Sequence, residues 1–268
     1  MKRKFSLVMS AAMILSLIAP MTNALAEDIQ TPETASTETI VAEAAASGGT
    51  TYYVDSTIGD DSNSGTSLDK VTATTFLPGD TILLKSGSIW NGEWLWPKGS
   101  GTADAPIKID KYGGDALPVI NGMGIDRGMN YSGAVHLRNQ EYWEIRNLEV
   151  TNDDDFDVDI DLSRPQGDNS WSSQAETRNG ILIIADGDLL NDGDDGIFDH
   201  IYIENCYVHD VDGPNDWNDT FTGGIIYNVV GTKIRPNTSF RDIRIAYNTI
   251  RKVDLLGITG FVQMAKSG

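Results

Sequence analysis

The chain of 268 residues has few cysteines and few basic residues, and each shortage excludes a class of protein. A single cysteine, Cys206, excludes a disulfide framework, and its place in an apolar run predicts a core position. The 20 basic residues are outnumbered by 39 acidic ones, which gives a net charge of −19. That charge disfavours nucleic acid and anionic lipid as partners, and it disfavours a polyuronate substrate unless a cation bridges the two.

Long apolar runs are also missing, except at the N-terminus. Residues 1–26 combine a basic start, an apolar stretch and Ala24–Ala26, which is the pattern of a cleaved signal peptide. The apolar stretch is short for a bilayer span and contains Pro20, so we expect export rather than anchoring. Removing these residues leaves 17 basic against 39 acidic residues. We therefore predict a secreted protein with no membrane span in its mature part, and we expect a monomer.

The composition divides the rest of the chain into two parts. Residues 27–49 consist mainly of Thr, Glu, Ala and Ser with almost no large apolar residue, which predicts a flexible linker. Residues 50–268 alternate short β-rich runs with turn residues, and this stretch is long enough to bury one large core.

Within 50–268 the sequence repeats itself. Three segments share alternating apolar residues followed by an Asn, and they span 142–150, 200–208 and 242–250. A short strand beginning near 134, 180 and 224 precedes each of them, so the period is about 45 residues. No stretch after the signal peptide shows a helical apolar period, which excludes helical solenoids.

A recurring order of strands is typical of stacked coils. A β-sandwich is the alternative, but it does not require the same Gly-Ile and Asn positions to recur in register. We therefore predict an all-β, right-handed parallel β-helix. The repeated Asn residues are expected in tight turns between consecutive sheets, because Asn tolerates left-handed backbone angles.

The first half of this region resembles a known group of proteins. Tyr52–Asp55, the turn-rich 59–67, Phe76–Gly87 and Pro106–Gly122 resemble the opening coils of secreted β-helical glycoside hydrolases and pectate-lyase-like polysaccharide lyases. The resemblance covers roughly 50–268 and implies the fold and an extracellular, glycan-related function, whereas it leaves the reaction type open. One loop is shorter than is usual in those proteins, since Ser67 runs directly into Leu68.

The last residues predict a further repeat. Gly257-Ile258 looks like the start of another unit, and no amphipathic helix or polar cap follows it before Gly268. Because an open coil exposes strand edges and apolar side chains, we expect these to be the N-terminal coils of a longer β-helix.

The repeat register also predicts a catalytic group. Aligning Val208 with Ile250 aligns Asp212 with Asp254, and stacked strands lie about 4.8 Å apart. Neighbouring carboxyl groups perturb each other's pKa, and a protonated and an ionised carboxyl are what glycoside hydrolysis needs. His209 and Asp210 precede the same turn, so the predicted catalytic residues are Asp212, Asp254, Asp210 and His209. The alternative is a stack of turn-capping Asp residues.

An acidic, glycine-containing stretch further predicts a cation site. Ca²⁺ prefers several carboxylate and carbonyl oxygens on a loop that can converge around it. The predicted Ca²⁺ ligands are Asp186, Asp188, Asp192, Asp194 and Asp195. Their order does not match an EF-hand, and a solvated acidic loop is the alternative.

Loop tryptophans complete the predicted site. Trp171 and Trp217 are expected to stack on sugar rings, with Asp216 as a further substrate-binding residue. The leading hypothesis is an extracellular glycoside hydrolase that acts on a weakly charged polysaccharide with paired carboxylates. A Ca²⁺-dependent lyase that uses Arg251 or Lys252 as its base is one alternative. A non-catalytic or vestigial glycan-binding β-helix is the other.

Overall fold

The computed structural model describes residues 48–58, 67–125, 131–153, 177–213, 222–231 and 238–262. The predicted signal peptide and nearly all of the predicted linker lie outside these ranges. Within them almost every element is a strand, and we find no helix that is both long and apolar enough to cross a bilayer.

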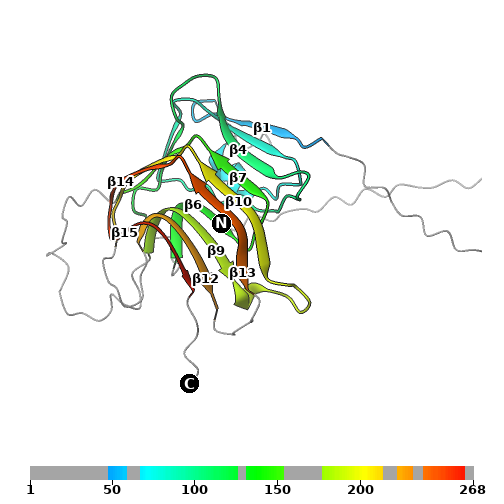
Figure 1. Cartoon of the computed structure of the whole chain (residues 1–268). Coiled ribbons are helices and arrows are strands. Elements are labelled where there is room, and N and C mark those ends of the chain that lie inside the picture. The colour runs from blue at the N-terminus through cyan, green and yellow to red at the C-terminus, as the bar shows by residue number, and fades with distance from the viewer. Residues whose placement is uncertain are drawn as a thin grey trace, which may run out of the picture. The chain divides into compact units, whose positions relative to one another are not determined.

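Three parallel sheets make up most of the described part of the chain, together with the helix α1 (Leu68–Ala73) and the 3-10 turn η1 (Gly187–Leu189) (Figure 1). The first sheet contains, in spatial order, β1 (Thr51–Val54), β2 (Thr81–Lys85), β4 (Ile107–Tyr112), β7 (Trp143–Arg146), β10 (Ile197–Glu204) and β13 (Ser239–Ala246). The second sheet contains β3 (Ile89–Asn91), β5 (Val119–Asn121), β8 (Glu149–Asn152), β11 (Tyr207–Val211) and β14 (Thr249–Val253). The third sheet contains β6 (Tyr131–Arg138), β9 (Thr177–Asp186), β12 (Gly223–Val230) and β15 (Leu256–Val262).

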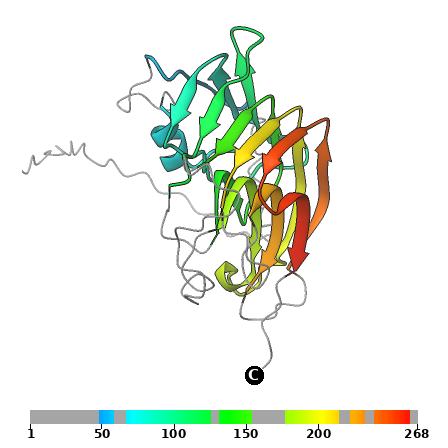
Figure 2. The same cartoon turned by 90° about the vertical axis from the view of Figure 1, so that its left-hand side faces the viewer.

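From β4 onward the chain visits the three sheets in turn, so that each set of three strands is one coil. The last two coils are β10–β12 and β13–β15, and each strand pairs in parallel with its equivalent in the preceding coil. Figure 2 shows these strands side by side, from blue at the first coil to red at the last. The predicted right-handed parallel β-helix is confirmed.

The interior consists of apolar side chains stacked in register from coil to coil. Trp143 pairs with Ile201, and both are fully buried. Cys206 is buried too, and burial raises the pKa of its thiol to about 12. The predicted core position of Cys206 is thus confirmed. Its thiol stays protonated at neutral pH and is therefore unreactive.

Turns between the first and second sheets repeat with the same backbone conformation. Asn147 and Asn205 have left-handed φ angles of 56°, as predicted. In the last coil the prediction is wrong by one residue, because Tyr247 takes the left-handed position with φ 59°. Asn248 instead uses its side chain, which accepts from the Cys206 N–H at 2.8 Å and thereby joins its own turn to the preceding coil.

The recurring Gly-Ile pairs mark another crowded corner of each coil. A β-carbon on Gly180 would lie 2.4 Å from Val208, and one on Gly224 would lie 2.8 Å from Ile250. Only glycine lets the third sheet approach the second so closely, which explains why glycine recurs there.

Candidate functional site

The predicted carboxylate pair lies where β11 and β14 end. Val208 pairs with Ile250 and Val211 with Val253, so the predicted register is confirmed. The next residues, Asp212 and Asp254, continue this stacking through their backbones. The Asp212 N–H donates to the Asn152 carbonyl at 3.2 Å, and the Asp254 N–H donates to the Val211 carbonyl at 2.9 Å. The two aspartates therefore occupy equivalent positions on consecutive coils.

The Asp254 carboxylate has a contact of its own in this corner. Its Oδ2 accepts from the Gly213 N–H at 3.4 Å, which is the bond expected of a turn-capping Asp. Gly213 itself is tightly enclosed, because a β-carbon there would lie 2.7 Å from the Thr222 hydroxyl and 3.0 Å from the Arg178 β-carbon. The corner thus brings the Asp212-Gly213 turn against Arg178 and Thr222.

Arg178 and Thr222 were not predicted from the sequence. Each lies two residues before a repeated glycine, Gly180 or Gly224, so the repeat register already placed them at equivalent positions. Thr222 is fully buried, and its hydroxyl has no hydrogen-bond partner among the described residues. Arg178 on β9 and Thr222, directly before β12, therefore border the turn that follows β11.

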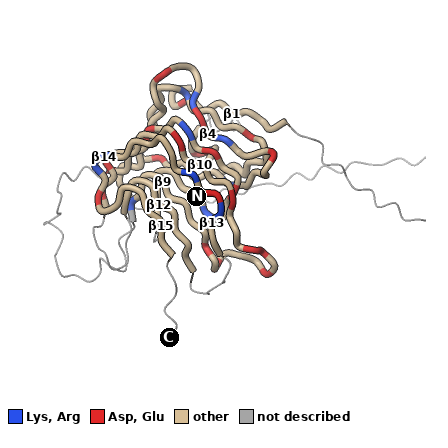
Figure 3. The backbone as a smooth tube through the Cα atoms, viewed as in Figure 1, with Lys and Arg blue, Asp and Glu red and all other residues tan. Residues whose placement is uncertain are grey.

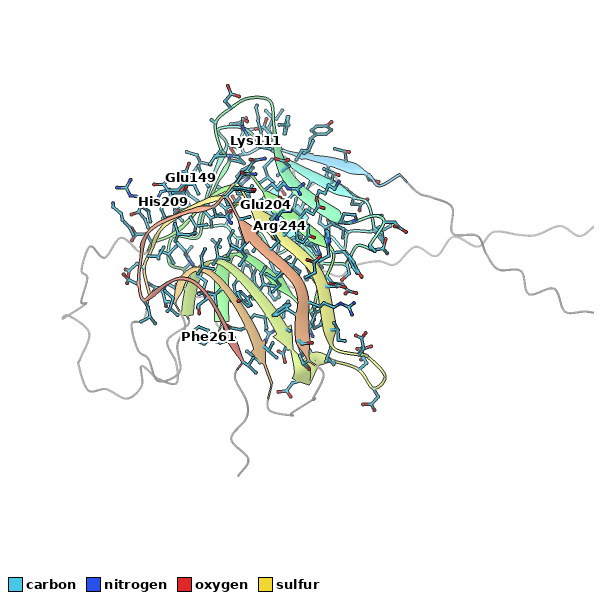
Figure 4. All side chains as sticks on the ribbon, viewed as in Figure 1. Lys111, Glu149, Glu204, His209, Arg244 and Phe261 are labelled. Carbon is cyan, nitrogen blue, oxygen red and sulfur yellow. The ribbon has the colours of Figure 1, made fainter. Side chains whose placement is uncertain are left out.

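His209 and Asp210 lie on β11, just before this turn (Figure 4). The two His209 ring nitrogens lie 2.6 Å from Asp210 Oδ2 and 3.1 Å from Glu149 Oε1. On its other side, Lys252 Nζ lies 3.3 Å from Asp210 Oδ1. Burial opposes ionisation of Asp210, but the hydrogen bonds from His209 and Lys252 outweigh it and hold its pKa below the ordinary value. Asp210 is therefore an ionised carboxylate at neutral pH.

The cluster links three coils on the outer face of the second sheet. Glu149 comes from β8, His209 from β11 and Lys252 from β14, and the Tyr207 ring stacks on His209 at 4.0 Å. Lys252 was one of the bases considered for lyase chemistry. Its ammonium group is instead engaged with Asp210.

Three of the five aspartates predicted to bind Ca²⁺ have hydrogen-bond partners within the chain. Asp186 accepts from Arg138 at 2.6 Å, Asp194 accepts from the Asn191 N–H, and Asp195 accepts from the Ile197 N–H. Across the described ranges, no group of three or more His, Cys, Asp or Glu residues is placed to hold a metal ion. The calcium site at these five aspartates stays a prediction.

The predicted substrate-binding residues Trp171, Asp216 and Trp217 lie outside the described residues. The described corner places Asp212 and Asp254 at equivalent positions on consecutive coils, and His209 and Asp210 lie on the strand that precedes Asp212. Paired carboxyl groups of this kind can serve as acid and base, or as acid and nucleophile, in glycoside hydrolysis.

Comparison with known proteins identifies similar chains. No protein-family model matches. A lacto-N-biosidase from Bifidobacterium longum subsp. longum is 32% identical over 262 residues, which include 79% of this chain and 16% of that protein. The native structure of a GH136 lacto-N-biosidase from Eubacterium ramulus superposes with a TM-score of 0.63 at 26% identity, and its selenomethionine derivative with 0.62.

The match extends over only part of these relatives. This chain spans about a sixth of the Bifidobacterium protein and about a third of the Eubacterium chain. The relatives are glycoside hydrolases by name, and a polysaccharide lyase is not among them, so the lyase alternative is not favoured. In sequence and in fold, the described coils are thus similar to a part of the bacterial GH136 lacto-N-biosidases.

Proposed function

We propose that this chain acts in glycoside hydrolysis, and specifically that it takes part in a lacto-N-biosidase reaction, the release of lacto-N-biose from a glycan. The observation that carries the proposal is the match of 79% of the chain to a lacto-N-biosidase at 32% identity. The register of Asp212 and Asp254 supports it, since the reaction needs two carboxyl groups across the scissile bond.

In the proposed reaction, one of the two aspartates protonates the leaving oxygen while the other assists attack at the sugar carbon. Arg178 borders the same turn and is proposed to contribute positive charge to the site. His209 and Asp210 form the neighbouring polar group on β11 and are proposed to position the turn rather than to contact the scissile bond.

The test is hydrolysis of p-nitrophenyl lacto-N-bioside by the purified chain, followed as release of p-nitrophenol. We expect Asp212→Asn and Asp254→Asn each to lower kcat by about 10²- to 10⁴-fold, the usual contribution of a positioned acid or base. Asp242→Asn is the matched control, because Asp242 lies on β13 and is bonded to Tyr202. Equal activity of all three variants would contradict the catalytic assignment.

A non-catalytic glycan-binding role is the alternative, and the hydrogen bond from Gly213 to Asp254 is the observation that favours it. In that case the chain would bind lacto-N-biose in calorimetry without turnover. Loss of binding on Asp254→Asn would then report a structural role for the carboxylate.

Export is part of the same proposal, because residues 1–26 read as a cleavable signal peptide. The intact mass of the protein recovered from culture medium tests it. A mass lower than 29.1 kDa by the weight of residues 1–26 is the expected result.

A further inference from the structure

Asn152, the last residue of β8, departs from the repeat inside the stack. Its partner in the next coil is Val211, and Val211 pairs in turn with Val253. Asn152 and Val211 are both buried, with 4% and 1% of their surfaces exposed. A position that is valine in the two following coils thus holds an amide in this one. A buried amide is costly unless it is hydrogen-bonded, so this departure from the repeat calls for an explanation.

The Asn152 side chain is hydrogen-bonded at both ends of its amide. Its Oδ1 accepts from the Gly124 N–H at 3.0 Å, and its Nδ2 donates to the Asn179 carbonyl at 3.0 Å. A β-carbon on Gly122 would lie 2.3 Å from Oδ1, so the amide also fits tightly against the backbone of the preceding coil. The side chain is therefore held in one orientation, in which it joins that coil to β9.

The backbone of Asn152 reaches the following coil as well. Its carbonyl accepts from the Asp212 N–H at 3.2 Å. This contact follows a β-bulge, because His209 and Asp210 on β11 together oppose the single residue Thr151 on β8. The extra residue moves the rest of β11 along by one position, and bulges of this kind redirect the side chains that follow them. The bulge is thus what brings Asp212 onto Asn152.

Asn152 lies between two parts of the candidate site. Its carbonyl holds the Asp212 backbone, and its Nδ2 holds β9 at Asn179. The residue before Asn179 is Arg178, whose β-carbon would lie 3.0 Å from a β-carbon on Gly213. The turn that carries Asp212 and the strand that carries Arg178 therefore approach each other across a spacing that one buried residue spans.

The surroundings of this corner are charged, whereas Asn152 is neutral. Acidic and basic residues lie together beside β14, while β12 and β15 carry no charged residue (Figure 3). A neutral amide holds its neighbours through hydrogen bonds of defined direction and adds no charge to the corner. Asn152 therefore fixes the geometry of the turn without changing its charge.

We propose that Asn152 is a positioning residue of the candidate site. It holds the Asp212 turn at a fixed place relative to Arg178 and thereby aligns the Asp212 carboxylate for the reaction. This inference rests on the proposed function, in which Asp212 is one of two reacting carboxyl groups. Misplacement of a reacting group by about 1 Å costs about 100-fold in rate, so a loosened turn is enough to lower turnover.

Asn152→Val tests the proposal, because it gives this coil the residue that the repeat has at Val211 and Val253. It removes both side-chain hydrogen bonds and keeps the backbone carbonyl that holds Asp212. We expect kcat for p-nitrophenyl lacto-N-bioside to fall about 10- to 100-fold while KM stays nearly unchanged. Asn152→Ser takes its place if the valine variant does not fold.

Asn248→Leu is the matched control. Asn248 also accepts a backbone N–H, that of Cys206 at 2.8 Å, and donates to a backbone carbonyl, that of Ile203 at 2.8 Å. It lies at the corner between the first and second sheets, where the equivalent residue two coils earlier is Leu148. We expect both variants to lower the thermal midpoint and only Asn152→Val to lower kcat. Equal losses of kcat would report a general effect of stability and would overturn the proposal.

A second comparison asks whether Asn152 acts through Asp212. In the Asp212→Asn background, Asn152→Val should lower kcat no further, because no reacting carboxylate is left to align. The same additional loss in that background as in the native chain would overturn the proposal.

Hydrogen exchange at the Asp212 N–H separates this inference from the proposed function. We expect exchange there to be at least about tenfold faster in Asn152→Val than in the native chain, and unchanged in Asn248→Leu. A native chain that shows this difference but no hydrolysis would contradict the proposed function and would support the hold of Asn152 on the turn. Unchanged exchange in Asn152→Val would overturn that hold, whatever the activity.

Discussion

The first and the last described coils are built from different kinds of sequence. At the first end, α1 breaks the strand repeat and buries Leu68 and Val71 against the interior. At the last described coil, the repeat continues unchanged and Ile258 and Val262 stay exposed. Covering a stack therefore takes residues that depart from the repeat, because a repeat unit can only present the same open edge again.

The contrast also says where the stability of the fold lies. We call side chains that pair in register from coil to coil a column. A side chain inside a column has neighbours in the coil above and in the coil below, whereas one in the last described coil has described neighbours on one side only. The same substitution should therefore lower the free energy of unfolding more inside the stack than in the last described coil.

The largest difference is expected for a charge placed in each end. Val71→Asp puts a carboxylate into a fully buried site, and we expect a loss of more than about 4 kcal/mol in the free energy of unfolding. Ile258→Asp should cost less than about 1 kcal/mol, because that side chain is already half in water. Urea denaturation followed by circular dichroism measures both. Similar losses in the two variants would mean that the ends are equally covered.

A truncation within one column should give the next largest difference. Ile225→Ala leaves a cavity between two coils, and we expect a loss of about 2–5 kcal/mol. Ile258→Ala removes the same atoms from the end of that column, so the expected loss is below about 1 kcal/mol. Urea denaturation measures both losses. Equal losses in the two variants would contradict the description of the column.

Outward charges should show a smaller version of the same contrast. Arg146 bonds Glu144 at 2.8 Å and Glu204 at 2.9 Å, and both carboxylates are largely buried. Arg146→Met would leave both without this partner, at a cost of about 2–3 kcal/mol. Arg244→Met should cost less than about 1 kcal/mol, because Arg244 is half exposed and Glu204 keeps Arg146. A larger loss for Arg244→Met would show that the end coil is held by its ion pairs.

Those features that the sequence predicted belong to the repeat itself. The register of Val208 with Ile250 follows from apolar alternation, since a shift by one residue would turn every side chain to the other face. The left-handed turns at Asn147 and Asn205 follow from a preference of a single residue type. Tyr247 shows the limit of that preference, because the stacked coils impose the left-handed angle on a residue that rarely adopts it.

The surroundings of the candidate site could not be predicted in the same way. Arg178 approaches Gly213 at the corner between two sheets, and the 34 residues that separate them in sequence include β10 and β11. The partner of Asp186 was not predicted either, because Asp186 accepts from Arg138, which comes from the preceding coil. The stacking of the coils determines which residue of the next coil a side chain contacts. The periodicity of the sequence shows only on which face of the sheet that side chain lies.

Acid should weaken the closed end through one ion pair. Asp55 is buried at the end of β1, and the hydrogen bond from Lys85, followed by those from Thr57, lowers its pKa to about 2 from the ordinary 3.8. Because the folded-state pKa is the lower one, this stabilisation is complete above about pH 4 and is lost as the pH falls toward 2. The effect should be the smallest of the series, since Lys85 is partly exposed and salt screens it.

Comparing the native chain with Asp55→Asn isolates this contribution. The native chain should lose more of its urea midpoint than the variant between about pH 5 and about pH 2.5, and the difference should shrink in high salt. Asp199→Asn is the matched change near the open end, because Arg241 likewise lowers the pKa of Asp199. Asp199 pairs with a largely exposed arginine, so its variant should depart less from native behaviour. If the two variants titrate alike, the ion pair at the closed end is no better shielded from water than the one beside the open coil.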